Sequence, residues 1–466
     1  MYNVFISWSN YYFLMMKIVI IGGVAAGAKA AAKSRRLLED AEIDLYTQDT
    51  HVSYSACGLP YYIEGNFDDY RTLLVRSPEE FAKSDINIHL RHRVTKILPK
   101  VKKILVENLD VPDAFLVDYD KLIIAVGARP FLPNIKHRAL PHVFTLRTIE
   151  DGIAIRNQLE LSKKVVLIGG GYIGIELLES CVKQGKLTTL IERGSRIMPT
   201  FDPDMSELIK NQLTSISEGK FDILTSQNVT ELLGDNNGVT AVKTESGVEI
   251  EADMVIICAG VVPNVELALD AGIALGETGA IKVTPKMETN ITDIYACGDC
   301  VEERQIVSGT HIWLPLGSNA NKEGRCAAMN ACGFEEAFQG VLSSSVTRCL
   351  KLTMSMTGLT QTQAEKLGYD VISTTVTKFD KVGYMPEANN ITLKIIADKK
   401  SGRLLGGQGI GAGDADKRIN SLATALLAKL TVEEFYNNDL TYSPPFSPTI
   451  DPLLNAAQIL LSKLAE

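Results

Sequence analysis

KIVIIGGVAAG at residues 17–27 and KVVLIGGGYIG at residues 164–174 align without gaps at an offset of 164 − 17 = 147 residues. Each segment has a lysine, an aliphatic run and a glycine-rich turn, and helical patterns follow at 28–40 and 175–185. Such apolar runs are typical of strands that are buried on both faces of a parallel sheet. Because the glycines let the backbone approach a pyrophosphate, the repeat predicts two dinucleotide-binding units.

The second turn, GGGYIG at residues 169–174, has the full pattern of spaced glycines. Glu192 follows its first glycine by 192 − 169 = 23 positions, close to the distance expected for a residue that binds the ribose hydroxyls. The pyrophosphate would then lie at the N-terminus of the following helix. Glu192 would repel a 2′-phosphate, which favours NADH, while Arg193 and Arg196 keep NADPH open.

The first turn departs from this pattern, because Val24 replaces the middle glycine. A later segment, TNITDIYACGDC at residues 289–300, resembles the second fingerprint of flavoproteins that hold two dinucleotides, with Asp299 at the ribityl chain. Two strand-plus-glycine segments, at 122–130 and 255–264, look like the connections that bracket the NAD domain in such proteins. These four signals in this order predict that the chain binds both FAD and NAD(P)H.

The rest of the chain divides around these signals. From about residue 340, a strand-like stretch at 390–398 and a helical pattern at 417–435 indicate an α+β domain. The predicted class is therefore α/β, with two Rossmann-like dinucleotide-binding domains and a C-terminal α+β domain. The expected boundaries are 16–149 with 256–335 for the FAD domain, 150–255 for the NAD(P) domain, and 340–466 for the C-terminal domain.

Composition limits the possible partners. The 466 residues carry 47 lysines and arginines against 56 aspartates and glutamates, a net charge of −9. So acidic a chain is a poor general binder of polyanions, and we expect neither nucleic acid nor membrane as a partner. Eight scattered cysteines favour a reducing, cytoplasmic compartment over a disulfide scaffold. The uncharged residues 1–15 fit a non-native or disordered extension better than a signal peptide or a membrane span.

HVSYSACGLPYYIEG at residues 51–65 contains the cysteine most suited to chemistry. Gly58 and Pro60 after Cys57 predict a turn into the start of a helix. Because the helix dipole and free amides favour a thiolate there, we expect a lowered pKa for Cys57. The competing interpretation is a buried apolar cysteine, the commoner environment of a lone cysteine. The two dinucleotide-binding units favour the redox role.

The chain resembles the pyridine nucleotide–disulfide oxidoreductases over residues 16–460. Within them it is most similar to the branch of coenzyme A disulfide reductases, NADH oxidases and NADH peroxidases, which use one redox-active cysteine. In agreement, Tyr62 stands five residues after Cys57, where dithiol relatives have a second cysteine. The motifs that carry the resemblance are GGVAAG (22–27), SACGLPYY (55–62), GGGYIGIE (169–176), YACGD (295–299) and YSPPF (442–446).

Without a second thiol, Cys57 can store an electron pair as a mixed disulfide with a small thiol or as a sulfenic acid. Oxidases and peroxidases of the family generally carry a histidine in the first glycine turn, where this chain has Ala25. We therefore expect an FAD-dependent NAD(P)H reductase of coenzyme A disulfide or a related small disulfide. An NADH oxidase or peroxidase that cycles Cys57 as sulfenic acid is the alternative, and a flavoprotein redox sensor is a third hypothesis.

The resemblance also implies roles for residues other than Cys57. Tyr384 and Tyr442 occur in contexts that reach the partner subunit's active site in coenzyme A disulfide reductases, which implies a homodimer formed through residues 340–466. A phenol at that place can protonate the leaving thiolate. Basic side chains should receive the phosphates of coenzyme A. The substrate-binding residues expected by resemblance are Arg36, Ser53 and Lys33.

The expected cofactor sites follow from the same segments. No metal site is expected, because Cys297 and Cys300 belong to the flavin strand and no second cysteine pair accompanies them. The residues expected at FAD are Gly22, Val24, Ala25, Gly27, Gly127, Gly298 and Asp299. Those expected at NAD(P)H are Gly169, Gly171, Tyr172, Gly174, Glu176 and Glu192.

Overall fold

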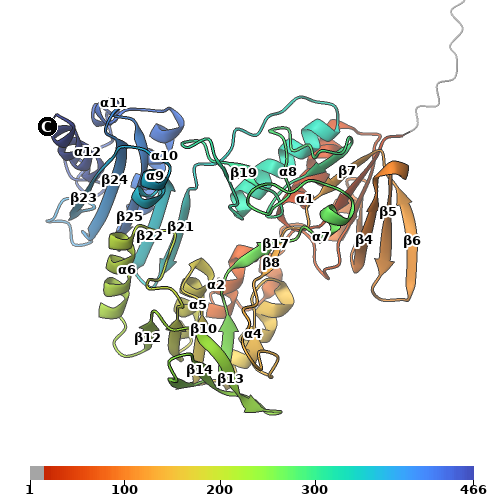
Figure 1. The fold of residues 1–466 in the computed structure, drawn as a ribbon, viewed down its shortest axis with the longest axis horizontal. Coiled ribbons are helices and arrows are strands. Elements are labelled where there is room, and N and C mark those ends of the chain that lie inside the picture. Colours follow the sequence, from red (N-terminus) through yellow and green to blue (C-terminus); the bar gives the residue numbers. More distant parts are fainter. Residues whose placement is uncertain (1–14, 466) are drawn as a thin grey trace, which may run out of the picture.

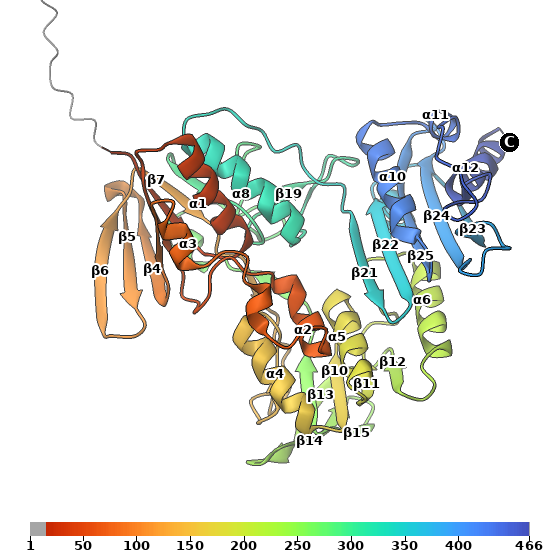
Figure 2. The same cartoon turned by 180° about the vertical axis from the view of Figure 1, so that it is seen from behind.

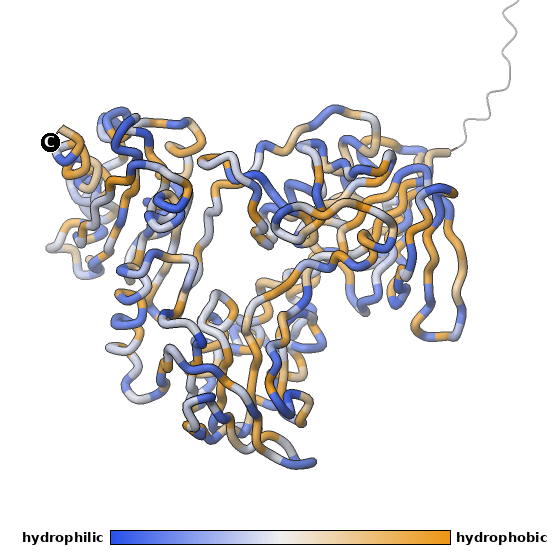
Figure 3. The backbone as a smooth tube through the Cα atoms, in the orientation of Figure 1, coloured by the Kyte–Doolittle hydropathy of each residue, from blue (hydrophilic) through white to orange (hydrophobic). Residues whose placement is uncertain are grey.

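The structure, a computed structural model, describes residues 15–465, so all but the last residue of the expected N-terminal extension lies outside the described residues. It confirms the α/β class, with two parallel-sheet domains and an α+β domain at the C-terminal end (Figure 1). The strands of the three central sheets are largely hydrophobic and lie inside their domains (Figure 3).

The first domain is built on a five-stranded sheet of order β18-β7-β1-β2-β3, in which every pairing is parallel. Helices α1 (Ala25–Leu37) and α8 (Gly317–Ala331) cover one face, and the antiparallel strands β4 (His92–Leu98), β5 (Lys103–Asn108) and β6 (Asp113–Asp118) cover the other (Figure 2). The aliphatic runs are therefore buried on both faces, as predicted. The sheet strands are β1 (Lys17–Ile21), β2 (Glu42–Tyr46), β3 (Ile86–His89), β7 (Lys121–Ile124) and β18 (Ile294–Ala296).

The second domain repeats this plan, with the sheet order β12-β11-β10-β16-β9 and α5 (Tyr172–Lys183) after the second glycine turn. Its edge strand, β9 (Val143–Phe144), falls within the segment 16–149 that was expected in the first domain. The antiparallel pair β8 (Ala128–Pro130) and β17 (Val261–Pro263) connects the two domains. The other strands of the sheet are β10 (Lys164–Ile168), β11 (Leu187–Ile191), β12 (Phe221–Leu224) and β16 (Met254–Ile257), and the flanking elements are α4 (Ile149–Leu161), α6 (Pro203–Ser215), β13 (Val229–Asp235), β14 (Gly238–Thr244) and β15 (Glu249–Glu251).

The segment that carries Cys57 packs between these domains. A single 3-10 turn, Ala56–Gly58, leads into the short helix α2 (Leu59–Glu64). Leu59, Tyr62 and Ile63 are buried in one apolar core with side chains of α4, β10 and α5. Because α2 is anchored in the second domain while β1 and β2 belong to the first, Cys57 is held where the two domains meet.

The C-terminal domain is an antiparallel sheet of order β21-β22-β25-β24-β23 with helices packed against it. The prediction of one helix over residues 417–435 is wrong, because the structure has two helices there: α10 ends at Leu427 and α11 begins at Val432. Lys429 between them has a φ of 60°, and the Thr431 side chain caps the second helix. The elements are α9 (Gln361–Lys366), α10 (Ala415–Leu427), α11 (Val432–Tyr436), α12 (Pro452–Leu464), β21 (Ser345–Cys349), β22 (Leu352–Gly358), β23 (Val371–Phe379), β24 (Asn390–Asp398) and β25 (Leu404–Gly411).

Candidate active site

A cavity of about 1600 Å³ lies between the first two domains and reaches the C-terminal domain. It collects many of the residues that the sequence singled out, from segments far apart in the chain. The predicted residues on its walls are Gly22, Val24, Ala25, Arg36, Ser53, Cys57, Gly127, Tyr172, Glu176, Gly298 and Asp299. Those that do not line it are Gly27, Lys33, Gly169, Gly171, Gly174, Glu192, Tyr384 and Tyr442.

The first glycine turn fits the pyrophosphate of FAD. Gly22 has a φ of 101°, and a Cβ built on it would lie 2.2 Å from the carbonyl oxygen of Ala125. A Cβ on Gly27 would lie 1.9 Å from the carbonyl oxygen of Gly22, so neither position can hold a larger residue without moving the backbone. Helix α1 begins beside the cavity with no side-chain cap on its first amides, and such amides bind phosphate readily.

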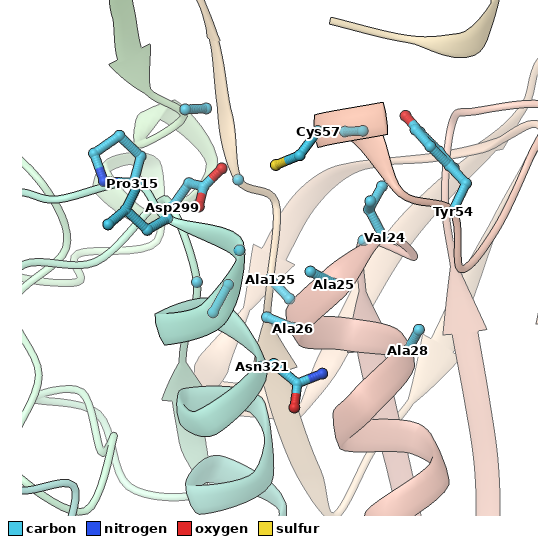
Figure 4. A pocket seen from close by; sticks show the side chains of 18 of the residues that line it. Val24, Ala25, Ala26, Ala28, Tyr54, Cys57, Ala125, Asp299, Pro315 and Asn321 are labelled. Atoms are coloured by element: carbon cyan, nitrogen blue, oxygen red, sulfur yellow. The ribbon is translucent and has the colours of Figure 1, made fainter. Parts of the chain in front are cut away.

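Asp299 occupies the opposite wall of the cavity (Figure 4). Its carboxylate lies 3.4 Å from the Arg147 guanidinium, and its backbone oxygen accepts a hydrogen bond of 2.9 Å from the Trp313 indole. Sequence reasoning missed Arg147, which also lines the cavity. The capping box of α4 that starts at Thr148 was the only local signal there, and it says nothing about a cavity.

Behind this wall lie two further carboxyls that sequence reasoning missed. Glu323 on α8 is fully buried and accepts a hydrogen bond of 2.7 Å from the Gly298 amide, and Glu303 is 5% exposed. Neither Oε1 of Glu323 nor Oε2 of Glu303 has a hydrogen-bond partner among the described residues. Burial raises the pKa of both carboxyls, and the charge of Glu323 raises that of Glu303 further. We therefore expect this pair of buried carboxyls to hold one proton between them.

The Cys57 side chain faces the open cavity, with its sulfur on the side of Asp299 (Figure 4). The expected lowering of its pKa is wrong for this structure. The cavity walls partly desolvate the thiol, which raises its pKa although the side chain stays exposed to the cavity. Glu176 and Asp299 raise this pKa further, and Arg147 opposes them. Helix α2 after the cysteine has only six residues, too short a dipole to outweigh these effects.

A longer helix approaches the sulfur from another part of the chain. A Cβ built on Gly317, the first residue of α8, would lie 3.9 Å from the Cys57 sulfur. The N-terminus of α8 has no side-chain cap, so the positive end of its dipole lies beside the thiol. The other seven cysteines are buried, which leaves Cys57 as the exposed thiol of the described chain.

Tyr172 and Glu176 project from the first turns of α5 into the cavity, and the C-terminal domain holds both. The Tyr172 hydroxyl lies 2.6 Å from the Ser345 hydroxyl, and the Thr347 hydroxyl donates a 3.0 Å hydrogen bond to Glu176. Burial raises the pKa of both Tyr172 and Glu176. Ser345 and Thr347 lie on β21, and no motif in the sequence connects them with α5.

The second glycine turn binds its acidic partner directly. Glu192 accepts hydrogen bonds from the amides of Gly170, at 2.8 Å, and Gly194, at 2.6 Å. A Cβ on Gly174 would lie 2.0 Å from the carbonyl oxygen of Gly169, the same close approach as in the first turn. Arg193 lines a separate cleft of about 460 Å³ beyond Glu192. This arrangement fits the ribose end of a pyridine nucleotide.

Basic side chains line another part of the large cavity. Lys29, Arg36 and Arg76 are among its lining residues, as is Ser53, while Lys33 is not. Arg76 stacks over the Phe81 ring at 4.3 Å and donates a 2.6 Å hydrogen bond to Ser84. This region can therefore receive an anionic ligand such as a phosphate.

Tyr384 and Tyr442 lie in the C-terminal domain, with exposed fractions of 73% and 51%. Neither contributes to the cavity of its own chain. Among residues 15–465 no helix is long and apolar enough to cross a membrane. The same described range has no group of three or more histidine, cysteine or acidic side chains placed to hold a metal ion.

Comparison with known proteins gives a consistent result. The chain is 36% identical to the NAD(P)H sulfur oxidoreductase (CoA-dependent) of Pyrococcus abyssi, over 92% of this chain and 95% of that protein. It is 34% identical to an NADH oxidase of Methanocaldococcus jannaschii, over 93% and 96%. The crystal structure of reduced Bacillus anthracis CoADR-RHD superposes with a TM-score of 0.93 at 33% identity, covering 97% of this chain and 81% of that one.

The family matches cover nearly the whole described chain. Residues 16–324 match the pyridine nucleotide-disulphide oxidoreductase family, and residues 346–453 match its dimerisation domain. The second match begins at β21, where the antiparallel sheet begins. These two matches, together with an exposed thiol on a cavity that the first glycine turn lines, show that the chain belongs to the pyridine nucleotide-disulphide oxidoreductase family.

Proposed function

We propose that the protein reduces coenzyme A disulfide, or a related small disulfide, through a mixed disulfide on Cys57. As a member of its family it is an FAD-dependent enzyme that uses NADH or NADPH. The observation that carries the proposal is the single exposed thiol in a cavity that is also lined by Lys29, Arg36 and Arg76. Such cationic side chains match the phosphates of coenzyme A.

The chain's own residues divide the work between cofactor and substrate. The turn at residues 22–27 and Asp299 would hold FAD, and Glu192 would bind the ribose of the pyridine nucleotide. Tyr172 and Glu176 would line the nicotinamide side of the cavity. When bound, FAD would supply the transfer of an electron pair from NAD(P)H to the sulfur chemistry at Cys57.

Cys57 performs the exchange chemistry. Its thiolate attacks one sulfur of the substrate disulfide, which forms a mixed disulfide and releases one thiolate. Two electrons then cleave the mixed disulfide, release the second thiolate and restore the Cys57 thiolate. The positive end of the α8 dipole, beside the sulfur, and the Arg147 guanidinium favour the charged sulfur in both steps.

The leaving thiolates need protons, and we assign these to Tyr384 and Tyr442 of a second subunit. Both phenols are exposed and lie outside the cavity of their own chain, so a homodimer that pairs the C-terminal domains could deliver them in trans. The domain that carries them matches a dimerisation domain. A phenol donates a proton or a hydrogen bond to a thiolate.

The eight cysteines form no disulfides in the described chain, which is typical of proteins that act in the reducing cytoplasm.

Oxidase or peroxidase activity is the second candidate, because a relative of similar identity is named an NADH oxidase. Cys57 is exposed enough to form a sulfenic acid. The first turn places Ala25 on the cavity wall, so no imidazole reaches the sulfur from there. Among the cavity-lining residues the one histidine is His92, whose Nδ1 is hydrogen-bonded to the Leu90 carbonyl at 2.7 Å. This difference favours the disulfide reductase.

Two measurements test the proposal. Mass spectrometry of the intact, non-reduced protein should find one coenzyme A attached, and the adduct should be absent from Cys57→Ser. NADH consumption should be faster with coenzyme A disulfide than with hydrogen peroxide or oxygen. Faster turnover with peroxide or oxygen, together with a sulfenic acid on Cys57, would overturn the proposal in favour of the second candidate.

A further inference from the structure

The loops that carry Tyr384 and Tyr442 are anchored on one buried guanidinium. Arg418, on α10, is 2% exposed. Its Nη2 donates a 2.6 Å hydrogen bond to the backbone oxygen of Asp380, and its Nε and Nη2 lie 3.2 and 3.1 Å from Oδ2 of Asp451. One planar side chain therefore contacts the start of the Tyr384 loop and the end of the Tyr442 loop.

The first loop is closed at its base beside this contact. Asp380 and Asn389 exchange backbone and side-chain hydrogen bonds, with the Asn389 amide 2.8 Å from Oδ1 of Asp380. Asp380 is 1% exposed, whereas Tyr384 midway along the loop is 73% exposed. The tyrosine thus projects from a loop whose two ends are fixed next to Arg418.

The second loop ends in an equally defined contact. Oδ1 of Asp451 caps α12 by accepting from the Leu453 amide at 2.9 Å, while Oδ2 accepts from the Ser447 hydroxyl at 3.1 Å. The two loops also touch directly, because the Val382 amide donates to the Pro444 carbonyl at 3.4 Å. Loops 380–389 and 442–451 therefore form one unit around Arg418.

We propose that Arg418 is a positioning residue that fixes Tyr384 and Tyr442 relative to each other, so that both phenols enter the partner's cavity in a set geometry. The inference rests on the proposed role of these tyrosines. Arg418 is buried together with Asp380 and Asp451, and a buried ion pair is weak evidence for stability but can fix a geometry. The rigid fork of arginine holds two acceptors at fixed angles, which an ammonium on a flexible stem does not.

Two variants remove the contact from opposite sides. Arg418→Lys keeps the charge and loses the fork, and Asp451→Asn keeps the Oδ1 cap of α12 while changing the atom that accepts from Arg418. Leu422→Ala is the matched control, because Leu422 is fully buried on the same helix and packs against Gly407 of β25. It removes apolar packing from α10 without removing a hydrogen bond to either loop.

With holoenzyme, we expect Arg418→Lys and Asp451→Asn to lower kcat for coenzyme A disulfide by about tenfold or more, since an oriented general acid typically contributes at least that much. The rate of flavin reduction by NADH should stay unchanged. Hydrogen exchange in residues 380–389 and 442–451 should speed up in both variants and stay at the wild-type rate in Leu422→Ala, which should also keep its turnover.

A double-mutant cycle separates positioning from general destabilisation. If Arg418 acts through the phenols, adding Arg418→Lys to Tyr384→Phe/Tyr442→Phe should lower kcat no further. An additive loss, or wild-type turnover of both single variants, would overturn the inference while leaving the tyrosine role intact. Full turnover of Tyr384→Phe/Tyr442→Phe would instead refute that part of the proposed function, and the inference with it. If Arg418→Lys fails to fold, Asp451→Asn decides the same outcomes.

Discussion

Replacing Glu303 by glutamine tests the shared proton behind the Asp299 wall. In the wild type the two carboxyls of Glu303 and Glu323 are buried, and one oxygen of each has no partner among the described residues. A proton held between them supplies the missing hydrogen bond. The glutamine amide has nearly the same shape and donates permanently to Glu323, so Glu303→Gln should preserve the Gly298 contact of Glu323 without any need for that proton.

The sign of the effect follows from the raised pKa of both carboxyls. Above the ordinary carboxyl value of 4.5, the unfolded chain releases a proton that the folded protein keeps, so the pair's contribution to stability is lost as the pH rises. For one proton that the folded protein retains, the free energy of unfolding falls by about 1.4 kcal/mol per pH unit. Between pH 6 and 8 this amounts to roughly 3 kcal/mol. For 466 residues this corresponds to a decrease in Tm of about 3 °C.

The assay is the thermal unfolding of holoenzyme from pH 5 to 8, followed by flavin fluorescence and by circular dichroism. The wild-type Tm should fall relative to that of Glu303→Gln by about 3 °C between pH 6 and 8. Glu302→Gln is the matched control, because Glu302 is also buried but accepts its hydrogen bonds from Thr278. The Tm of Glu302→Gln should change with pH in the same way as the Tm of the wild type. Parallel profiles of wild type and Glu303→Gln would contradict the shared proton.

Three further outcomes are expected. Cys57→Ser should keep FAD and its reduction by NADH but lose disulfide turnover, and its anaerobic titration should need one two-electron equivalent fewer than the wild type; an unchanged equivalent count would refute the single-cysteine mechanism. Gly27→Ala should be purified largely without FAD, because its Cβ would lie 1.9 Å from the Gly22 carbonyl oxygen, and a wild-type ratio of flavin to protein absorbance would contradict this. Arg147→Met removes the cation that opposes the raised pKa of Cys57, so the pH profile of thiol alkylation should move to higher pH, while an unmoved profile would show that Arg147 does not act on the thiol.

The sequence alone was sufficient for the features that a short stretch of chain encodes. The aliphatic runs at 17–21 and 164–168 form parallel strands, and the turns after them start helices, as predicted. A strand buried on both faces and a turn of spaced glycines can each be recognised within about a dozen residues. Cys57 could be singled out in the same way. The helix expected at 417–435 failed because hydrophobic periodicity continued through Lys429, whose left-handed backbone divides it into two helices.

Only the tertiary structure decided the electrostatics and the supports of the site. Arg147 contacts Asp299, which is 152 residues away in the sequence, and Tyr172 contacts Ser345, which is 173 residues away. The pKa of Cys57 is raised rather than lowered because the cavity walls remove water and bring two carboxylates near. The long helix that starts beside the sulfur begins at Gly317, far from Cys57 in the sequence. Solvation and charge depend on every group within a few ångströms, and folding brings those groups from distant segments that no local pattern relates.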